Sequence, residues 1–185
     1  HELFPAIRIE TFIEDKIPVQ DFTYDGRDYI LTGTVSETNQ GETQKTLIGI
    51  SFEDISDITN LQKQVDDKKT VVCVAIIDNY DEVLKETPNS NHGVLVGDIE
   101  RCISLWVDKG GGIYRRYERD KFVILFEAAR FEVLYKEKFT ILNDVKEINQ
   151  QNKIPVTLSI GVSNAADDIK ENDRIALAAL DMALG

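Results

Sequence analysis

The chain has 185 residues, with 21 lysines and arginines, 33 aspartates and glutamates, and a formal net charge of −12. This acidic balance argues against sequence-independent binding of nucleic acid or anionic lipid, since both depend on an excess of basic side chains. The longest apolar run, Val71–Ile77, is much shorter than the roughly 18 residues that cross a bilayer. The chain starts at His1 without a signal-peptide pattern. We therefore expect a soluble piece of a longer protein, with no nucleic-acid partner.

The first sixty residues have the pattern of an antiparallel sheet. Two extended runs, Phe22–Tyr24 and Asp28–Val35, flank the dipeptide Asp25-Gly26, which favours the positive φ angles of a tight hairpin. A second turn at Asn39–Glu42 leads into a third strand at Thr46–Phe52. Because three strands cannot cover both of their own faces, we expect this sheet to associate with a second copy of the chain.

A polar helix is predicted to follow at Asn60–Thr70. Leu61 and Val65 lie one helical turn apart within it, and Thr59 or Asn60 can cap its start. Such a narrow apolar stripe suits a connector or a short coiled coil. We place a domain boundary here, near residue 68.

From Val71 onward strands and helices alternate, which predicts an α/β fold with the order βααββαβα and a mixed sheet flanked by helices. Asn172 or Asp173 can cap the last helix. The predicted strands are Val71–Ile77, Ile113–Tyr117, Phe122–Phe126 and Ile154–Val162, the last interrupted at Gly161, and the predicted helices are Asp78–Lys85, His92–Asp108, Ala128–Asn149 and Asn172–Leu184.

The two cysteines have neither the number nor the spacing of a disulfide framework or a metal site. Cys73 lies within the apolar run and Cys102 within a helical pattern. We expect both to be small buried side chains in a reducing, cytosolic compartment.

Five short segments resemble the GGDEF domain family. Asp78 ends a strand, Gly97-Asp98 lies in the next long helix, and Arg116–Phe122 forms a hairpin tip in the place of the family's Arg-Tyr-Gly-Gly-Asp-Glu-Phe signature. Ser159–Val162 and Leu180–Leu184 follow in the order of the family's Ser-Ile-Gly strand and Ala-Asp-x-Ala-Leu helix. The resemblance covers residues 71–185 and implies the fold of that family.

The resemblance also implies a site at the hairpin tip. It makes Asp78 and Asp120 the ligands of a Mg²⁺ ion that binds weakly and together with a nucleotide. It makes Asp98, Arg119 and Lys121 the nucleotide-binding residues, with ATP and GTP as the alternatives. Simpler interpretations stay open: Asp78 can cap the following helix, Asp120 can be a turn residue, and Asp98 can be a solvated charge.

The signature itself has changed at positions that matter for catalysis. Glu118 and Arg119 replace the two glycines, so side chains stand where the family's backbone approaches phosphate. Lys121 replaces the signature glutamate, and Tyr80 stands where many relatives keep a second aspartate. Two-metal phosphoryl chemistry needs closely grouped carboxylates. We therefore expect no diguanylate cyclase activity and assign no catalytic residue.

The N-terminal part extends the resemblance. Three strands that end in Asp57-Ile58-Thr59 and lead into a polar helix resemble the C-terminal half of a PAS domain. A PAS domain followed by a GGDEF domain with a changed signature resembles the GdpP-type cyclic-di-AMP phosphodiesterases of Gram-positive bacteria. The domains implied are residues 1–59 as the PAS part, 60–70 as the linker helix and 71–185 as the degenerate GGDEF domain.

In that family two transmembrane helices precede the PAS domain, and DHH and DHHA1 domains with the phosphodiesterase site follow the GGDEF domain. This chain has no Asp-His-His sequence, and its histidines are His1 and His92. The family's hydrolase activity is therefore not expected from it. Haem binding is implied for an intact PAS domain only, and the full-length protein is expected at the cytoplasmic side of the cell membrane.

These expectations describe a sensory and regulatory segment of a cyclic-di-AMP phosphodiesterase. It is expected to be a homodimer that binds a nucleotide, hydrolyses ATP weakly at most, and acts on downstream DHH and DHHA1 domains. Two alternatives remain: a dimerisation or interaction module that binds no nucleotide, and an active nucleotide cyclase, which the changed signature disfavours.

Overall fold

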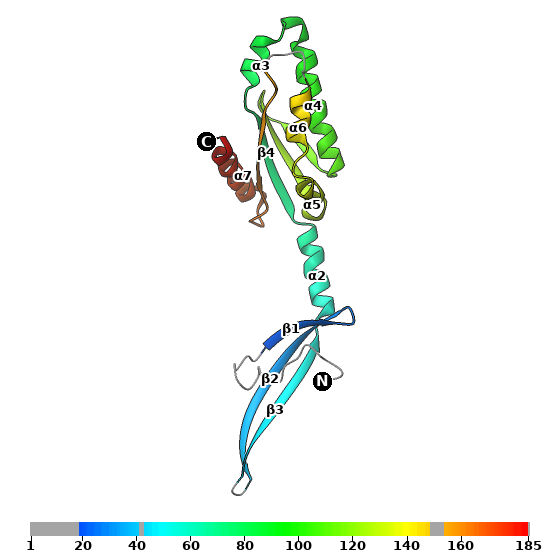
Figure 1. Ribbon diagram of the computed structural model, residues 1–185, viewed down its shortest axis with the longest axis vertical. Coiled ribbons are helices and arrows are strands. Elements are labelled where there is room, and N and C mark those ends of the chain that lie inside the picture. The colour runs from blue at the N-terminus through cyan, green and yellow to red at the C-terminus, as the bar shows by residue number, and fades with distance from the viewer. Residues whose placement is uncertain (1–18, 41–42, 149–153, 185) are drawn as a thin grey trace. The chain divides into compact units, whose positions relative to one another are not determined.

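The computed structural model describes residues 19–40, 43–148 and 154–184 (Figure 1). The chain divides into two compact units, residues 1–64 and 65–185, and each is described by itself. None of the helices in the described part has the length and apolar character that a membrane crossing requires.

The first unit contains an antiparallel sheet with the order β1-β2-β3. The turn between β1 and β2 is made by Asp25 and Gly26 at φ angles of 50° and 74°, so the predicted hairpin is confirmed. The predicted turn at Asn39–Glu42 includes residues 41–42, which lie outside the described part. The strands are β1 Val19–Tyr24, β2 Arg27–Gln40 and β3 Thr43–Asp54.

Helix α2, Ser56–Asp67, begins four residues before the predicted start. The carboxylate of Asp54 accepts hydrogen bonds from the backbone N–H and the hydroxyl of Ser56, over 3.0 and 2.6 Å. Thr59 therefore lies inside the helix instead of capping it, and its hydroxyl donates to the carboxylate of Asp28 over 2.7 Å. The predicted cap was wrong because a side chain of the preceding strand satisfies the helix start.

The sheet of the second unit has the order β5-β6-β4-β7. Its pairings β4–β6, β4–β7 and β5–β6 are all antiparallel, so the α/β fold is confirmed but the expectation of a mixed sheet was wrong. β6 and β7 run in the same direction, yet β4 lies between them and no parallel neighbours result. The strands are β4 Thr70–Ile77, β5 Ile113–Arg116, β6 Lys121–Glu127 and β7 Leu158–Ser163.

Helices cover both faces of this sheet (Figure 1). Alternate residues of β4 divide between two cores: Cys73 and Ala75 pack on the side of α3 to α6, and Val72 and Val74 pack on the side of α7. This double burial explains why β4 is apolar throughout its length. The helices are α3 Tyr80–Glu86, α4 His92–Lys109, α5 Ala128–Lys136, α6 Ile141–Asp144 and α7 Ile169–Leu184, with short 3₁₀ helices at Asn89–Asn91 and Val145–Glu147.

The long helix predicted at Ala128–Asn149 is interrupted. Lys138 and Phe139 have φ angles of 56° and 53°, which separate α5 from α6. The turn places the Phe139 ring against Phe131 and Trp106, at centroid distances of 5.8 and 6.2 Å. Burial of this ring offsets the cost of the left-handed backbone, a long-range effect that helical periodicity does not report.

Gly161 does not interrupt β7 but lies within it, paired with Val74. A Cβ atom at this position would lie 2.0 Å from the carbonyl oxygen of Ala176 and 2.6 Å from the backbone nitrogen of Leu180. The glycine is therefore needed because α7 packs directly on the strand backbone.

Asn172 lies in the first turns of α7, which begins at Ile169, and not at its cap. Its buried side chain accepts hydrogen bonds from the hydroxyl of Ser163 over 2.8 Å and from the backbone N–H of Ala166 over 3.0 Å. It thereby fastens the end of β7 and the following loop to the helix.

The predicted burial of the cysteines is confirmed for Cys73 and only in part for Cys102. Both thiols are free, Cys73 is fully buried, and Cys102 is half-buried. Burial raises the pKa of the Cys73 thiol to about 12, so this side chain is unreactive at neutral pH.

Candidate functional site

The two carboxylates predicted as metal ligands lie at the same end of the sheet. Asp78 directly follows β4 and is exposed, and Asp120 directly precedes β6 and is half-buried. The backbone N–H of Ile77 donates to the carbonyl oxygen of Asp120 over 2.9 Å, and that of Asp78 donates to Thr157 over 3.0 Å. The described residues contain no group of three or more histidine, cysteine or acidic side chains that could hold a metal. An ion here would therefore need further oxygens from a ligand or water.

Arg116 organises the hairpin tip, which we define as residues 117–121. Its Nε donates to the carbonyl oxygen of Glu118 over 3.2 Å. Its Nη2 donates to the carbonyl oxygen of Arg119 and, over 3.3 Å, to the hydroxyl of Tyr80. Its Nη1 lies 3.6 Å from Oε2 of Glu100. One guanidinium thus binds two tip carbonyls and connects the tip to α3 and α4.

Arg119, predicted to bind nucleotide, contacts α3. Its Nη2 lies 3.0 Å from a carboxylate oxygen of Asp81, and the two side chains are 68% and 59% exposed. Its guanidinium also lies 5.6 Å from the centre of the Tyr80 ring. Tyr80, which stands where many relatives keep a second aspartate, therefore contacts two arginine side chains, those of Arg116 and Arg119.

Lys121, the second cation predicted to bind nucleotide, is paired within the hairpin. Its Nζ lies 3.0 Å from Oε2 of Glu118. This hydrogen bond raises the pKa of Lys121 above its ordinary value. Both cations at the tip are thus already paired with carboxylates.

Asp98 is exposed on α4, and the described residues give it no hydrogen bond or ion pair. The carboxylate of α4 that pairs with Arg116 is Glu100, two residues further along the helix. The roles predicted for Asp78, Asp98, Arg119, Lys121 and Asp120 remain predictions, because the structure fixes their positions and not their ligands.

Sequence reasoning missed the side chains that hold these elements together. Asn79 donates from Nδ2 to the carbonyl oxygen of Pro155 over 2.8 Å, and its Oδ1 accepts from the backbone N–H of Thr157 over 3.0 Å. Tyr80 and Asp81 contact Arg119 of the tip, and Glu100 pairs with Arg116. The available signal was weak: Asn79 to Asp81 form a polar run directly after an apolar strand, where ligand sites of α/β sheets concentrate.

Side chains fill the space beside the tip. The narrow gap there has no room for a water molecule, and it is lined by Ile77, Tyr80, Val96, Ile99, Arg116 and Phe122. A larger hollow of about 430 Å³ lies between α7 and strands β4 and β6, and Tyr117 of the tip lines it. The tip therefore lies at the surface and is held by its own contacts.

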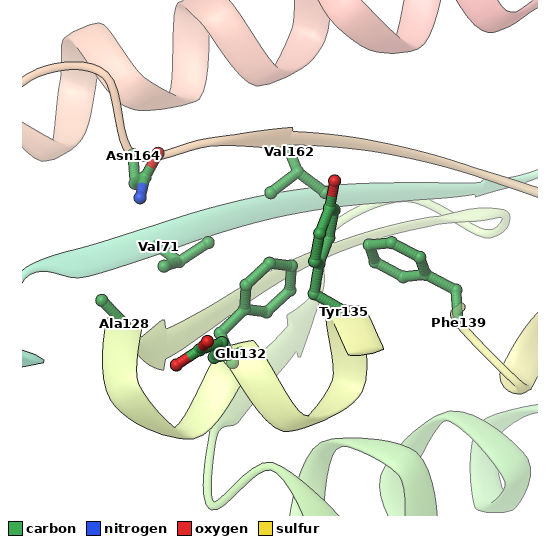
Figure 2. A pocket seen from close by; sticks show the side chains of 8 residues that line it. Val71, Ala128, Glu132, Tyr135, Phe139, Val162 and Asn164 are labelled. Atoms are coloured by element: carbon green, nitrogen blue, oxygen red, sulfur yellow. The ribbon is translucent and has the colours of Figure 1, made fainter. Parts of the chain in front are cut away.

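A hollow of about 400 Å³ lies between α5 and the sheet (Figure 2). Tyr135 extends from α5 between Val162 and Phe139, and Glu132 of the same helix also lines the hollow (Figure 2). Val71, which lines it, is at the start of β4, roughly 20 Å along the strand from Asp78. This hollow is separate from the predicted site.

Comparison with known proteins gives a family and a fold. The family described as "Cyclic-di-AMP phosphodiesterase GdpP-like, GGDEF domain" matches residues 75–185. Cyclic-di-AMP phosphodiesterase GdpP of Bacillus subtilis (strain 168) is 25% identical over 134 residues, which are 72% of this chain and 20% of the relative. Cyclic-di-AMP phosphodiesterase PdeA of Listeria monocytogenes serotype 1/2a (strain 10403S) is 29% identical over 132 residues, 71% of this chain and 20% of the relative. The chain thus spans about a fifth of the length of these relatives.

Solved GGDEF domains share the fold. The GGDEF domain of FimX from Pseudomonas aeruginosa has a TM-score of 0.51 at 17% identity, over 70% of this chain and 86% of that one. The active GGEEF domain of a diguanylate cyclase from Vibrio cholerae has a TM-score of 0.52 at 17% identity, over 69% and 83% of the two chains.

Proposed function

The chain belongs to the family of GdpP-like GGDEF domains, and from this premise we propose that it is a regulatory segment whose hairpin tip binds a nucleoside triphosphate without making a cyclic dinucleotide. The observation that supports the proposal is the placement of two carboxylates and two cations at one end of the sheet. The β4–β6 pairing puts Asp78 beside the start of the strand that Asp120 precedes, and Arg119 and Lys121 are the neighbours of Asp120 in the chain.

The donor set fits one magnesium ion. Mg²⁺ in nucleotide sites is commonly held by one or two carboxylates, with phosphate oxygens and waters as its other ligands. Asp78 and Asp120 would hold the ion, which would neutralise phosphate charge. Arg119 and Lys121 would bind the phosphates through charge-assisted hydrogen bonds.

The residues of the tip favour nucleotide binding over the synthesis of a cyclic dinucleotide. Glu118 and Arg119 place side chains at the tip, and Glu118 brings negative charge next to the phosphate site. Tyr80 removes a carboxylate that a second ion would need. Binding of ATP, with hydrolysis that is weak at most, is what this set of groups supports.

In a longer protein, the proposed role of this segment is to change the activity of a hydrolase domain according to whether a nucleotide is bound. The curated relatives are about five times as long as the matched region and are named cyclic-di-AMP phosphodiesterases. We infer that this segment acts on such a domain from the cytoplasmic side of the membrane, and that the chain itself does not cleave cyclic-di-AMP.

Calorimetric titration of the chain with ATP and GTP, with and without Mg²⁺, tests the proposal. Asp78→Asn and Asp120→Asn keep the side-chain shape and remove the charge. Each is expected to weaken Mg²⁺-dependent binding about tenfold, as for loss of one charged contact in a partly solvated site. Asp181→Asn, an exposed position on α7, is the matched control and should bind as the parent does.

The alternative of a dimerisation module is favoured by one observation. Ile58, Leu61 and Val65 of α2 are 65%, 61% and 58% exposed, at helical spacing. This stripe suits a short coiled coil with a second copy. A chain that binds no nucleotide in the titration and sediments as a dimer at micromolar concentration would replace the nucleotide proposal with this alternative.

A further inference from the structure

Each cation of the tip already has an anion as its partner. Arg119 pairs with Asp81 of α3, and Lys121 pairs with Glu118 of the tip, both at 3.0 Å. These distances are those at which a guanidinium or an ammonium group binds a phosphate oxygen. The two carboxylates therefore occupy the places that ligand phosphates would take.

The two pairs point in different directions. Arg119 extends to α3, where its guanidinium also lies over the Tyr80 ring. The Lys121 ammonium turns back to Glu118 within the hairpin. A ligand with several phosphates can therefore contact the two cations with different phosphate groups, which a single phosphate group cannot do.

The two ion pairs are weak enough for a ligand phosphate to replace the carboxylates. The four side chains are between 31% and 68% exposed, and ion pairs at such exposure are weak. A singly bound phosphate that replaces one carboxylate gains little, because it exchanges one ion pair for another. A ligand that replaces both carboxylates gains binding free energy in two ways: its charge is higher, and its two contacts are linked in one molecule.

We propose that Asp81 and Glu118 are specificity-determining internal anions, which compete with the ligand for Arg119 and Lys121 and thereby select polyphosphates over monophosphates. This inference rests on the proposed function, since it concerns the same site. Ligand binding then also separates the tip from α3, because Arg119 must leave Asp81.

The test is titration with inorganic triphosphate, ATP and AMP, in EDTA to exclude metal effects. Asp81→Asn and Glu118→Gln should each tighten triphosphate binding about fivefold, the effect of removing one exposed ion pair. In the double variant, the ratio of the affinity for ATP to the affinity for AMP should be smaller than in the parent. Glu82→Gln, which removes the same charge from the exposed neighbour of Asp81 on α3, should change binding less than twofold.

A double-mutant cycle separates competition from simple repulsion. Competition requires Arg119, so Asp81→Asn should have no effect in an Arg119→Ala background. If Asp81→Asn tightens binding equally in both backgrounds, or no more than Glu82→Gln does, through-space repulsion explains the result and the inference fails.

The remaining outcomes distinguish the two proposals. If the parent binds ATP with the affinity of the Asp81→Asn and Glu118→Gln variants, the inference is overturned and the proposed function stands. If the parent does not bind triphosphate in EDTA and the double variant does, the internal anions are supported; the proposed function of the parent fails only if the parent also does not bind ATP in the presence of Mg²⁺. If neither chain binds triphosphate in EDTA, the inference is overturned, and the separate titration with ATP and Mg²⁺ decides the proposed function.

Discussion

The β1–β2 and β5–β6 hairpins of this molecule are closed in different ways. In the first, Asp25 and Gly26 adopt positive φ angles of 50° and 74°, and the turn follows from the backbone preferences of two residues. In the second, the tip contains none of the positive-φ residues of the described chain. Arg116 closes it by binding the carbonyl oxygens of Glu118 and Arg119.

This difference shows which contacts stabilise each turn. The first turn depends on residues next to each other in the sequence. The second depends on Tyr80, 36 positions before Arg116, and on Glu100. A turn held by such distant contacts can change its shape when those contacts change, whereas the Asp25-Gly26 turn depends on its own backbone.

The largest expected effect comes from removing the side chain that closes the second hairpin. Arg116→Ala should lower the free energy of unfolding of the second unit by about 2 kcal/mol, because two carbonyl oxygens and Glu100 lose a charged partner. Denaturant unfolding followed by the fluorescence of Trp106 measures this. Arg116→Lys should recover only part of the loss, since an ammonium group cannot reproduce the fork of the guanidinium; full recovery would show that charge alone closes the tip.

A smaller effect is expected at the first hairpin. Gly26→Ala should destabilise the first unit by about 1 kcal/mol, the cost of a side chain at positive φ. No atom lies within 4 Å of the added Cβ, so the cost is conformational and not steric. Gly97→Ala in α4 has equally open space and should instead stabilise by about 0.5 to 1 kcal/mol. Hydrogen exchange of the β1–β2 amides would report the first change, and equal effects of both substitutions would contradict this account.

The smallest effect is a difference in pH dependence between the two hairpins. Hydrogen bonds from Thr59 and Thr23 lower the pKa of Asp28 below its ordinary value of 3.8, and those from Ser56 lower that of Asp54. Their contribution is present above about pH 4 and is lost as the pH falls through the lowered pKa values. The raised pKa of Lys121 has the opposite effect. The contribution of its ion pair to the free energy of unfolding is present below pH 10.5 and is lost as the pH rises through the raised pKa.

Amide exchange measured across a pH series should therefore show the first hairpin loosening in acid and the tip loosening in alkali. Asp28→Asn should remove part of the acid dependence. Parallel behaviour of the two hairpins at both extremes would refute the assignment of these groups.

Elements with a local signal were predicted well from the sequence. The apolar run of β4, the amphipathic α4 and the Asp25-Gly26 turn each depend on nearby residues, and each is in the structure. Prediction was wrong where a distant contact decides the local shape. Phe139 breaks a helical pattern because its ring packs on Trp106, and Gly161 serves the approach of α7.

The candidate site shows the same limit. The resemblance to a known family indicated that Asp78 and Asp120 would meet at one end of the sheet, and the strand pairing brings them there. It did not indicate that Asp81 would pair with Arg119 or that Arg116 would bind the tip. Those contacts depend on side-chain conformations, which no spacing in the sequence encodes.

Gly161 has a mechanical consequence. Because α7 packs directly on the backbone of β7 at Gly161, we expect the strand and the helix to move together. β7 begins close to Thr157, whose carbonyl oxygen accepts the N–H of Asp78. A 16-residue helix is about 24 Å long, so a tilt of about 5° around its middle displaces each end by about 1 Å. A tilt of α7 that follows a movement at the site end of β7 would therefore displace both ends of the helix by similar distances.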